Sequence, residues 1–595
     1  MSFVGEIRRR KVFQVAVVYA VVAWLLIQII DVVNDPLSLP AWFDTVAIVL
    51  LMLGLPIAII LAWAFDITPA GVVRTPDLDV DTGTGVPVGA PHQPTQSPEQ
   101  VSSSPPARSV APPPGVLPNS VAVLPLENLS PNPDDAYFAA GIHEEILNCL
   151  TKIKDLSVIA RTSVKRYADT DKSIAEIAEE LGVGTVMEGS VRYAGERVRV
   201  TAQLIDAVTE DHLWSEVYER DLADVFAIQA DIAAKIAEAL EAEFSVAEKE
   251  SLDKLPTTSP EAYALYLRAM AILQEHGLEV GGSPELRSSS QSYLDRAIAA
   301  DPDFTLAYVQ RARIAVFSLN LDPGTRENYA SRRKKVEDLA LRDLEKALAL
   351  DPTIGAAHGV LARIHQYNWR GSEALEAYGR AVQLSPNDPD VLIDYAVFCA
   401  FSGRTEEAIR LGQRALTLDP NSGPRLNLLA LIYLAAGDPD AGIETLRRAT
   451  ELSPAFSIGR GSLATWEAVR GNHAEALNEA RIAEQLFRGN TNPTHLGELV
   501  NSYGRVGHRE DAERLFHQLE EIAETRRIPA AAWVLAYLGL GDDEQALHWL
   551  TRAADTPEPY EGYFALMLIK NGSHFDPVLD EPRFQAVRDR LGYKD

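Results

Sequence analysis

Two long apolar runs near the N-terminus dominate the pattern of hydrophobic and polar positions. Residues 12–33 carry a single charge, Asp31, and residues 45–65 carry none. At about 1.5 Å of rise per residue, each run is long enough to cross a hydrocarbon core of about 30 Å as a helix. The pattern therefore predicts a two-span membrane hairpin within residues 1–70, with residues 12–65 in contact with a lipid bilayer.

The charges around these runs predict the orientation of the hairpin. Arg8, Arg9, Arg10 and Lys11 precede the first run, whereas the connecting loop contains no Lys or Arg. Because basic residues favour the cytoplasmic side, we expect a cytoplasmic N-terminus. Two crossings return the chain to that side, so the remainder is expected in the cytoplasm, anchored to a bacterial inner membrane. One miscounted span would place it in the periplasm instead.

A cleaved signal peptide is the alternative interpretation of the first run. The run exceeds the roughly 7 to 15 apolar residues of a signal sequence, and a second run follows it closely, so two spans are preferred. Residues 71–118 then contain eleven prolines with Gly, Ser and Thr. Such a segment buries too little apolar surface to offset its ordering entropy, which predicts a disordered linker. A polyproline II ligand for another protein is the alternative there.

Residues 119–248 have the pattern of an α/β domain. Residues 120–129 are a β-branched apolar run, and apolar residues at helical spacing follow from Phe138 to Leu150. Apolar and polar positions alternate with period two over residues 198–204, as in a strand with one buried face. The order of these elements predicts a mixed sheet with helices packed on it.

The C-terminal half repeats with a period of 34 residues. Prolines close successive helical units in the phrases ALALDPT, AVQLSPN, ALTLDPN and ATELSPA, at Pro352, Pro386, Pro420 and Pro454. This period is typical of tetratricopeptide repeats (TPR), and the segment resembles that family over about 300 residues. We expect about eight repeats over residues 259–559 and a capping segment over residues 560–595 that covers the last repeat.

The α/β region carries a second resemblance. Its runs SVAVLPLENLSPNPDDAYFAAGIHEEILNCLTKI, ARTSVKRY and ELGVGTVMEGSVRYAGERVRVTAQLIDAVTEDHLWSEVYERDL are similar to the TolB/FlgO-like domain of bacterial membrane-linked proteins. In that family TPR repeats often follow the domain, and some members carry a nucleotide cyclase or a winged-helix domain. The run RRRKVFQVAVVYAVVAWLLIQ also resembles a two-span anchor of members that lack those domains. The resemblance implies a multidomain fold class: a two-helix transmembrane hairpin, an α/β TolB-like domain with a mixed sheet, and an all-α TPR superhelical solenoid.

Charge and composition narrow the class of function. The 595 residues include 84 Asp and Glu against 55 Lys and Arg, so the basic surface that neutralises phosphates is missing and no nucleic-acid partner is expected. Two cysteines, Cys149 and Cys399, exclude a disulfide framework. The sequence has no phosphate-binding loop, nucleophile elbow, paired-histidine zinc motif or kinase signature set. We therefore expect no enzyme, and no catalytic residue, cofactor or metal; an unrecognised hydrolase in the α/β domain is the alternative.

Two polar clusters of the α/β domain are interpreted as structural. His143, Glu144 and Glu145 are interpreted as a solvated helix face rather than a metal site. The pair Asp211 and His212 is interpreted as the end of a hairpin rather than a catalytic pair.

Stacked repeats form a concave groove that is lined by the first helix of each unit, and such grooves bind peptides. Analogy with the TPR family gives seven candidate groove residues: Arg363, Gln366, Ile393, Asp394, Val397, Asn427 and Leu431. Because three of them are apolar, we expect an extended or helical segment of a protein partner rather than a free C-terminus.

The preferred hypothesis is a non-enzymatic, membrane-anchored scaffold or adaptor that recruits a protein partner through the TPR groove. The TolB-like domain would serve as a second interaction or sensing module. One alternative is a sensory or regulatory subunit for a separately encoded nucleotide cyclase or transcriptional signalling system. Another is an array that only stacks against its own α/β domain or against a second copy of the chain.

Overall fold

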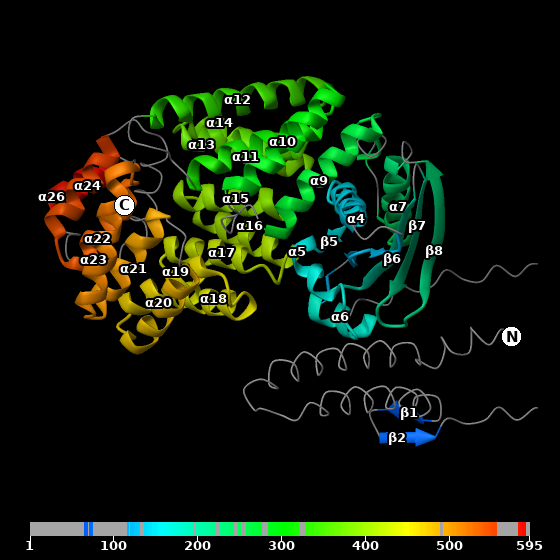
Figure 1. The fold of residues 1–595 in the computed structure, drawn as a ribbon, viewed down its shortest axis with the longest axis horizontal. Coiled ribbons are helices and arrows are strands. Elements are labelled where there is room, and N and C mark those ends of the chain that lie inside the picture. Colours follow the sequence, from blue (N-terminus) through cyan, green and yellow to red (C-terminus); the bar gives the residue numbers. More distant parts are fainter. Residues whose placement is uncertain are drawn as a thin grey trace, which may run out of the picture. The chain divides into compact units, whose positions relative to one another are not determined.

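The computed structural model describes most of the chain from residue 116 onward and two short strands before it (Figure 1). The described residues are 65–68, 71–74, 116–117, 119–130, 136–194, 197–221, 225–242, 245, 248–250, 254, 257–276, 284–321, 328–487, 492–555 and 581–590. The chain divides into two compact units, Met1–Ala107 and Arg108–Asp595. In the first unit, strand β1 (Phe65–Thr68) pairs antiparallel with strand β2 (Gly71–Arg74).

The structure corrects the predicted membrane hairpin. Among the residues described above, no helix combines the length and the apolar character that a bilayer crossing requires. Phe65, the last residue of the second predicted span, begins strand β1 and lies opposite Arg74 of β2. A hydropathy run specifies only length and polarity, whereas strand pairing depends on a partner segment that the run does not contain. The fold class with a transmembrane hairpin was therefore wrong.

The predictions that depended on the hairpin are corrected with it. These are the contact of residues 12–65 with a lipid bilayer, the multi-pass localisation in a bacterial inner membrane, and the cytoplasmic placement of the rest of the chain. The first predicted span, residues 45–64 of the second, and the basic residues Arg8, Arg9, Arg10 and Lys11 lie outside the described residues.

The second unit begins with a mixed sheet, as the strand pattern predicted. Its strand order is β5-β3-β6-β7-β8, with β4 also paired to β6. Strands β3, β4, β5 and β6 pair in parallel, and β6, β7 and β8 pair antiparallel. The strands are β3 (Ser120–Val123), β4 (Glu127–Asn128), β5 (Ser157–Val158), β6 (Thr185–Ala194), β7 (Arg197–Asp206) and β8 (His212–Asp221).

Helices pack on both faces of this sheet. On one face lie α4 (Ala136–Leu150) and α7 (Val225–Ala239), and the predicted apolar positions from Phe138 to Leu150 are buried in the core there. A second, smaller core on the other face involves α5 (Arg161–Val164), the 3-10 turn η2 (Lys165–Tyr167) and α6 (Ile174–Leu181). Helix α6 ends at Gly182, whose φ of 67° lies in the left-handed region that glycine adopts at low cost.

An array of paired helices follows the sheet (Figure 1). The helices are α9 (Pro260–His276), α10 (Pro284–Ala300), α11 (Thr305–Leu321), α12 (Tyr329–Leu350), α13 (Gly355–Tyr367), α14 (Gly371–Leu384), α15 (Pro389–Phe401), α16 (Thr405–Leu418), α17 (Gly423–Ala435), α18 (Pro439–Leu452), α19 (Ser457–Val469), α20 (His473–Phe487), α21 (Pro493–Arg505), α22 (Arg509–Thr525), α23 (Ala530–Leu540), α24 (Asp543–Asp555) and α26 (Pro582–Arg590). Within α26, Phe584 is fully buried in a core that it shares with α23 and α24.

The 34-residue period has a local cause in each unit. The turn between the two helices contains a glycine at residues 403, 437 and 471, with φ of 80°, 80° and 84°. Most other residues avoid this left-handed conformation, so glycine recurs there. Where the helices of a pair meet, alanines allow close approach; Ala396, Ala408 and Ala415 are fully buried. These short-range requirements explain why the repeat is readable in the sequence.

Candidate partner groove and its junction with the α/β region

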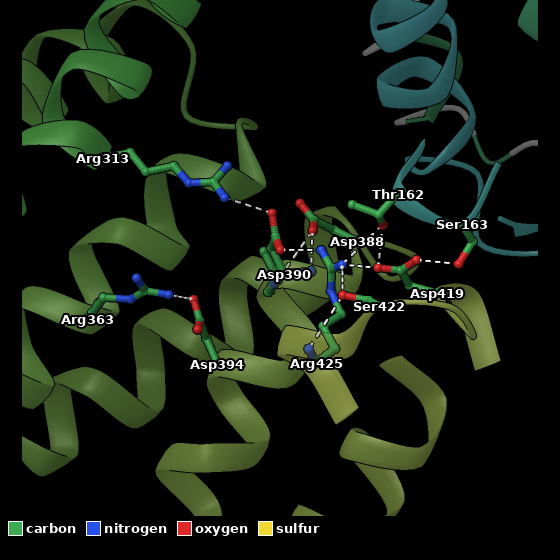
Figure 2. Close-up of polar contacts among 11 residues, drawn as sticks. Thr162, Ser163, Arg313, Arg363, Asp388, Asp390, Asp394, Asp419, Ser422 and Arg425 are labelled. Carbon is green, nitrogen blue, oxygen red and sulfur yellow. Dashed lines mark hydrogen bonds and ion pairs between the residues drawn. The ribbon is translucent and has the colours of Figure 1, made fainter. Parts of the chain in front are cut away.

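The seven predicted groove residues lie on α13, α15 and α17, the first helices of three successive units. Two of them form an ion pair across neighbouring units, because Arg363 donates to Asp394 (Figure 2). Their side chains are 20% and 23% exposed. Burial by itself disfavours the charged guanidinium, but Asp394 together with Tyr367 and Tyr378 outweighs burial and raises the pKa of Arg363. The structure therefore places a charged, partly accessible pair on this part of the array.

The other five candidates differ in accessibility. Gln366 is buried and its side-chain oxygen accepts a hydrogen bond of 2.7 Å from the Tyr378 hydroxyl. Ile393 is buried in the core between units. Val397 and Leu431 are half-buried, with apolar atoms still accessible. Asn427 is buried, and its Oδ1 has no hydrogen-bond partner among the described residues. The role of these residues in partner binding stays a prediction.

The sequence did not point to a polar network that joins the array to the α/β region. Its centre is Asp419, in the turn between α16 and α17, whose side chain is fully buried. Thr162 Oγ1 and Ser163 Oγ of α5 each donate a hydrogen bond of 2.5 Å to this carboxylate. Arg425 of α17 forms an ion pair with the same carboxylate (Figure 2).

The network continues toward the predicted groove. Arg425 also pairs with Asp390 at the start of α15, and Arg313 of α11 donates to the other oxygen of Asp390 at 2.8 Å (Figure 2). We use the name junction network for Thr162, Ser163, Asp419, Arg425, Asp390 and Arg313. It links α5 of the α/β region to the first helices of three units through alternating charges, which strengthens each hydrogen bond within it.

Two other turns between units also contact the α/β region or the segment that follows it. Asn387 Nδ2, in the turn before α15, donates to the carbonyl oxygen of Ile153 at 2.7 Å. Lys254 Nζ pairs with Asp351, in the turn before α13, at 2.7 Å. These turns belong to the phrases ALALDPT, AVQLSPN and ALTLDPN of the repeat. The array thus contacts its own α/β region and the segment that follows it through the turns of successive units.

The sequence shows an aspartate at position 419, but it does not distinguish this aspartate from the one at the same position of another repeat. Asp351 and Asp419 occupy the same position of the 34-residue motif. In the structure, however, Asp351 pairs with a lysine that is 47% exposed, whereas Asp419 pairs with an arginine that is 10% exposed. Only the tertiary fold distinguishes the two aspartates.

The interpretation of residues 143–145 as a solvated face was wrong. His143 is 1% exposed, and its Nε2 lies 2.8 Å from the carbonyl oxygen of Val123. Burial lowers the pKa of His143 to about 4, so the ring is neutral at pH 7. Glu145 is also buried, because α9 packs over this face of α4. In the part of the chain that the structure describes, no three His, Cys, Asp or Glu side chains are grouped to hold a metal.

Glu145→Gln is expected to abolish the loss of stability that the wild-type chain undergoes between pH 5 and pH 8. Burial, with the neighbouring Glu144, raises the pKa of Glu145 to about 7 in the folded chain, from 4.5. A carboxyl group with a raised folded pKa stabilises the fold fully below its unfolded pKa, and this contribution is lost as the pH rises through 7. The wild-type chain should therefore lose on the order of 2 kcal/mol between pH 5 and pH 8.

Urea denaturation of both proteins at the two pH values tests this. The variant should be more stable than the wild type at pH 8, and the difference should shrink toward pH 5. The same pH dependence in both proteins would contradict a raised pKa of the buried carboxyl group at position 145.

Comparison with known proteins identifies the class of the array. Two family models described as tetratricopeptide repeat match residues 360–423 and 401–457. The prediction of TPR repeats in the C-terminal region is confirmed, and TPR arrays as a class are protein–protein interaction scaffolds. The resemblance of the α/β region to TolB/FlgO-like domains is not confirmed by these matches.

Similar proteins match parts of the chain. A Rhizobium meliloti (strain 1021) protein named "Putative adenylate cyclase 3" is 40% identical over 198 residues, which cover 33% of this chain and 32% of that protein. The match thus spans about a third of that relative's length. The structure of Pseudomonas aeruginosa pilF is 23% identical, covers 36% of this chain and 94% of its own, and has a TM-score of 0.28. A thermophilic TPR protein of Thermus thermophilus is 16% identical, and the match covers 34% of this chain and 98% of that protein, with a TM-score of 0.28.

Proposed function

We propose that this chain is a non-enzymatic scaffold that recruits a segment of a protein partner on the first helices of its TPR array. The observation that carries this proposal is the partly accessible surface of the first helices α13, α15 and α17. The half-buried Val397 and Leu431 lie on α15 and α17, and the Arg363–Asp394 ion pair joins α13 and α15, so apolar and charged atoms are open to a bound segment together.

The neighbouring side chains suit a segment with mixed character. The half-buried Val397 and Leu431 offer apolar surface to apolar side chains of the partner. The partly exposed pair of Arg363 and Asp394 offers both signs of charge on the adjacent helices. Such a combination favours an internal, extended or helical segment over a chain terminus that carries one charged carboxylate.

The α/β region serves as a second interaction or sensing module in this proposal, in keeping with its resemblance to TolB/FlgO-like domains. A second candidate function is supported by the relative whose name includes adenylate cyclase. In that case, the chain is a sensory or regulatory subunit of a separately encoded nucleotide cyclase. The two candidates share the same groove and differ in the identity of the partner.

Replacing Val397 and Leu431 together with Asp is expected to weaken partner capture at least tenfold, because two carboxylates would enter an apolar contact. The measurement uses the intact chain with a photo-crosslinking residue at position 428, beside the predicted contact, and quantifies crosslinked products by mass spectrometry. Recovery of a nucleotide cyclase would favour the second candidate function.

The matched control is Leu375→Asp on α14, the second helix of its unit, where Leu375 is already exposed. This variant should capture the same products as the wild type. If the Val397 and Leu431 substitutions leave the products unchanged as well, the first helices of these units are not the binding surface.

A further inference from the structure

Asp390 lies beside the predicted groove and is also part of the junction network. It lies on α15, four residues before Asp394, and therefore about one helical turn from the predicted groove pair. Its side chain is 32% exposed, so a bound segment can reach it. One of its oxygens accepts from Arg425, the same guanidinium that pairs with the buried Asp419. Asp390 thus connects accessible groove surface to the contact between the array and α5 (Figure 2).

Hydrogen bonds near Asp419 hold the α/β region on the array. The Ala160 N–H donates to the carbonyl oxygen of Leu418 at 2.7 Å, and the Asn421 N–H donates to Ser163 Oγ at 2.9 Å. Both hydrogen bonds depend on α5 remaining beside the turn that contains Asp419. A shift of Arg425 away from Asp419 would leave a fully buried carboxylate with less compensation, which is costly.

The charges around Asp390 show that the pairs are ionic. Burial by itself would raise the pKa of Asp390, but the guanidinium groups of Arg425 and Arg313 outweigh it and hold the pKa below its usual range. Asp388, which caps α15, accepts from the backbone N–H groups of Asp390 and Val391 at 2.9 and 3.2 Å. Glu144 of the α/β region contributes a further negative charge near Asp390, and this carboxylate lies 3.6 Å from Arg161.

We infer that the series Asp390, Arg425 and Asp419 couples occupancy of the groove to docking of the α/β region on the array. A basic side chain of a bound segment that engages Asp390 competes with Arg425 for the same carboxylate. Without Asp390 the guanidinium of Arg425 is no longer held in position beside Asp419, and α5 loosens. By linkage, loosening α5 changes the affinity of the groove for that segment by the same factor. The competition of a bound segment for Asp390 rests on the proposed function, whereas the coupling between Asp390 and α5 is a property of the chain alone.

Hydrogen–deuterium exchange of the intact chain, without any partner, tests the coupling. Asp390→Asn removes one of the two carboxylates that hold Arg425, so peptides that contain Ala160 and Asn421 should exchange about tenfold faster than in the wild type. Asp394→Asn is the matched control, because it removes a carboxylate from the same helix one turn away that pairs with Arg363 instead. This control should leave those peptides within about twofold of the wild type.

The reverse direction provides a second measurement. The double variant Thr162→Ala and Ser163→Ala removes both hydroxyl donors to Asp419, and exchange at the start of α15 should rise while exchange in α13 stays unchanged. Exchange in β7, within the sheet, reports whether each variant remains folded. If Asp390→Asn and Asp394→Asn affect the α5 peptides equally, or neither does in folded protein, the coupling is refuted while the proposed partner binding stands or falls separately.

Discussion

Asp419→Ala is expected to lower the free energy of unfolding by about 3–5 kcal/mol. The substitution removes a fully buried carboxylate that pairs with Arg425, a guanidinium that is only 10% exposed. It also removes the acceptor of the hydroxyl groups of Thr162 and Ser163. The variant would keep the buried guanidinium of Arg425 and the buried hydroxyl of Ser163 with reduced compensation, and this deficit is the reason for the large effect. The urea midpoint of the intact chain measures it.

Asp351→Ala is the matched control, because Asp351 holds the same position in the repeat motif. Its partner, Lys254, is 47% exposed, so the ion pair is screened and its loss should cost no more than about 1 kcal/mol. The motif position is identical and only the tertiary surroundings differ. Equal losses at the two positions would show that the aspartate serves the turn itself and that the junction network contributes nothing to stability.

Gly504→Ala is expected to destabilise the chain by about 3 kcal/mol. Gly504 lies on α21, where a Cβ atom would overlap the carbonyl oxygen and the Cα of Gly539 on α23. These atoms are backbone, so no side chain can rotate away and the two helices would have to move apart. Gly497 on α21 has the same relation to the backbone of Ala532 on α23. The close approach of the two helices therefore depends on glycine along its length.

Gly379→Ala on α14 separates this effect from helix propensity. Gly379 is exposed inside a helix, and nothing lies within 4 Å of the position that its Cβ would take. Alanine there should stabilise the chain by up to about 1 kcal/mol, since it reduces the entropy lost on folding. Thermal unfolding of both variants should shift in opposite directions. A shift of the same sign in both would contradict steric exclusion at Gly504.

Several elements were predictable because their causes are local. The apolar spacing from Phe138 to Leu150 predicted α4, and the period-two alternation predicted β7. The turn at Gly182 follows from a single left-handed residue. The repeat pattern also placed Arg363 and Asp394 on the first helices of their units, whereas their role as groove residues, which came from analogy with the TPR family, stays a prediction. In each case the determining interactions span a few residues.

Other predictions failed where a distant element decides the outcome. The apolar run that ends at Phe65 has the length of a span, yet Phe65 lies in a strand paired with a segment beyond the run. His143 and Glu145 are polar residues on a helix, and their burial depends on α9, more than a hundred residues further on. Periodicity identifies one apolar face of a helix and gives no information about what covers the opposite face.

By itself, the sequence determined the paired helices of the repeat, their 34-residue period and the alternating sheet that precedes them. These depend on backbone conformation and side-chain size at fixed short spacings. Only the tertiary structure decided that the turn at Asp419 holds α5, across 257 positions of chain between Thr162 and Asp419. Equivalent turns carry nearly the same residues, so the difference between a solvated aspartate and a buried, paired one arises from what the folded chain brings beside it.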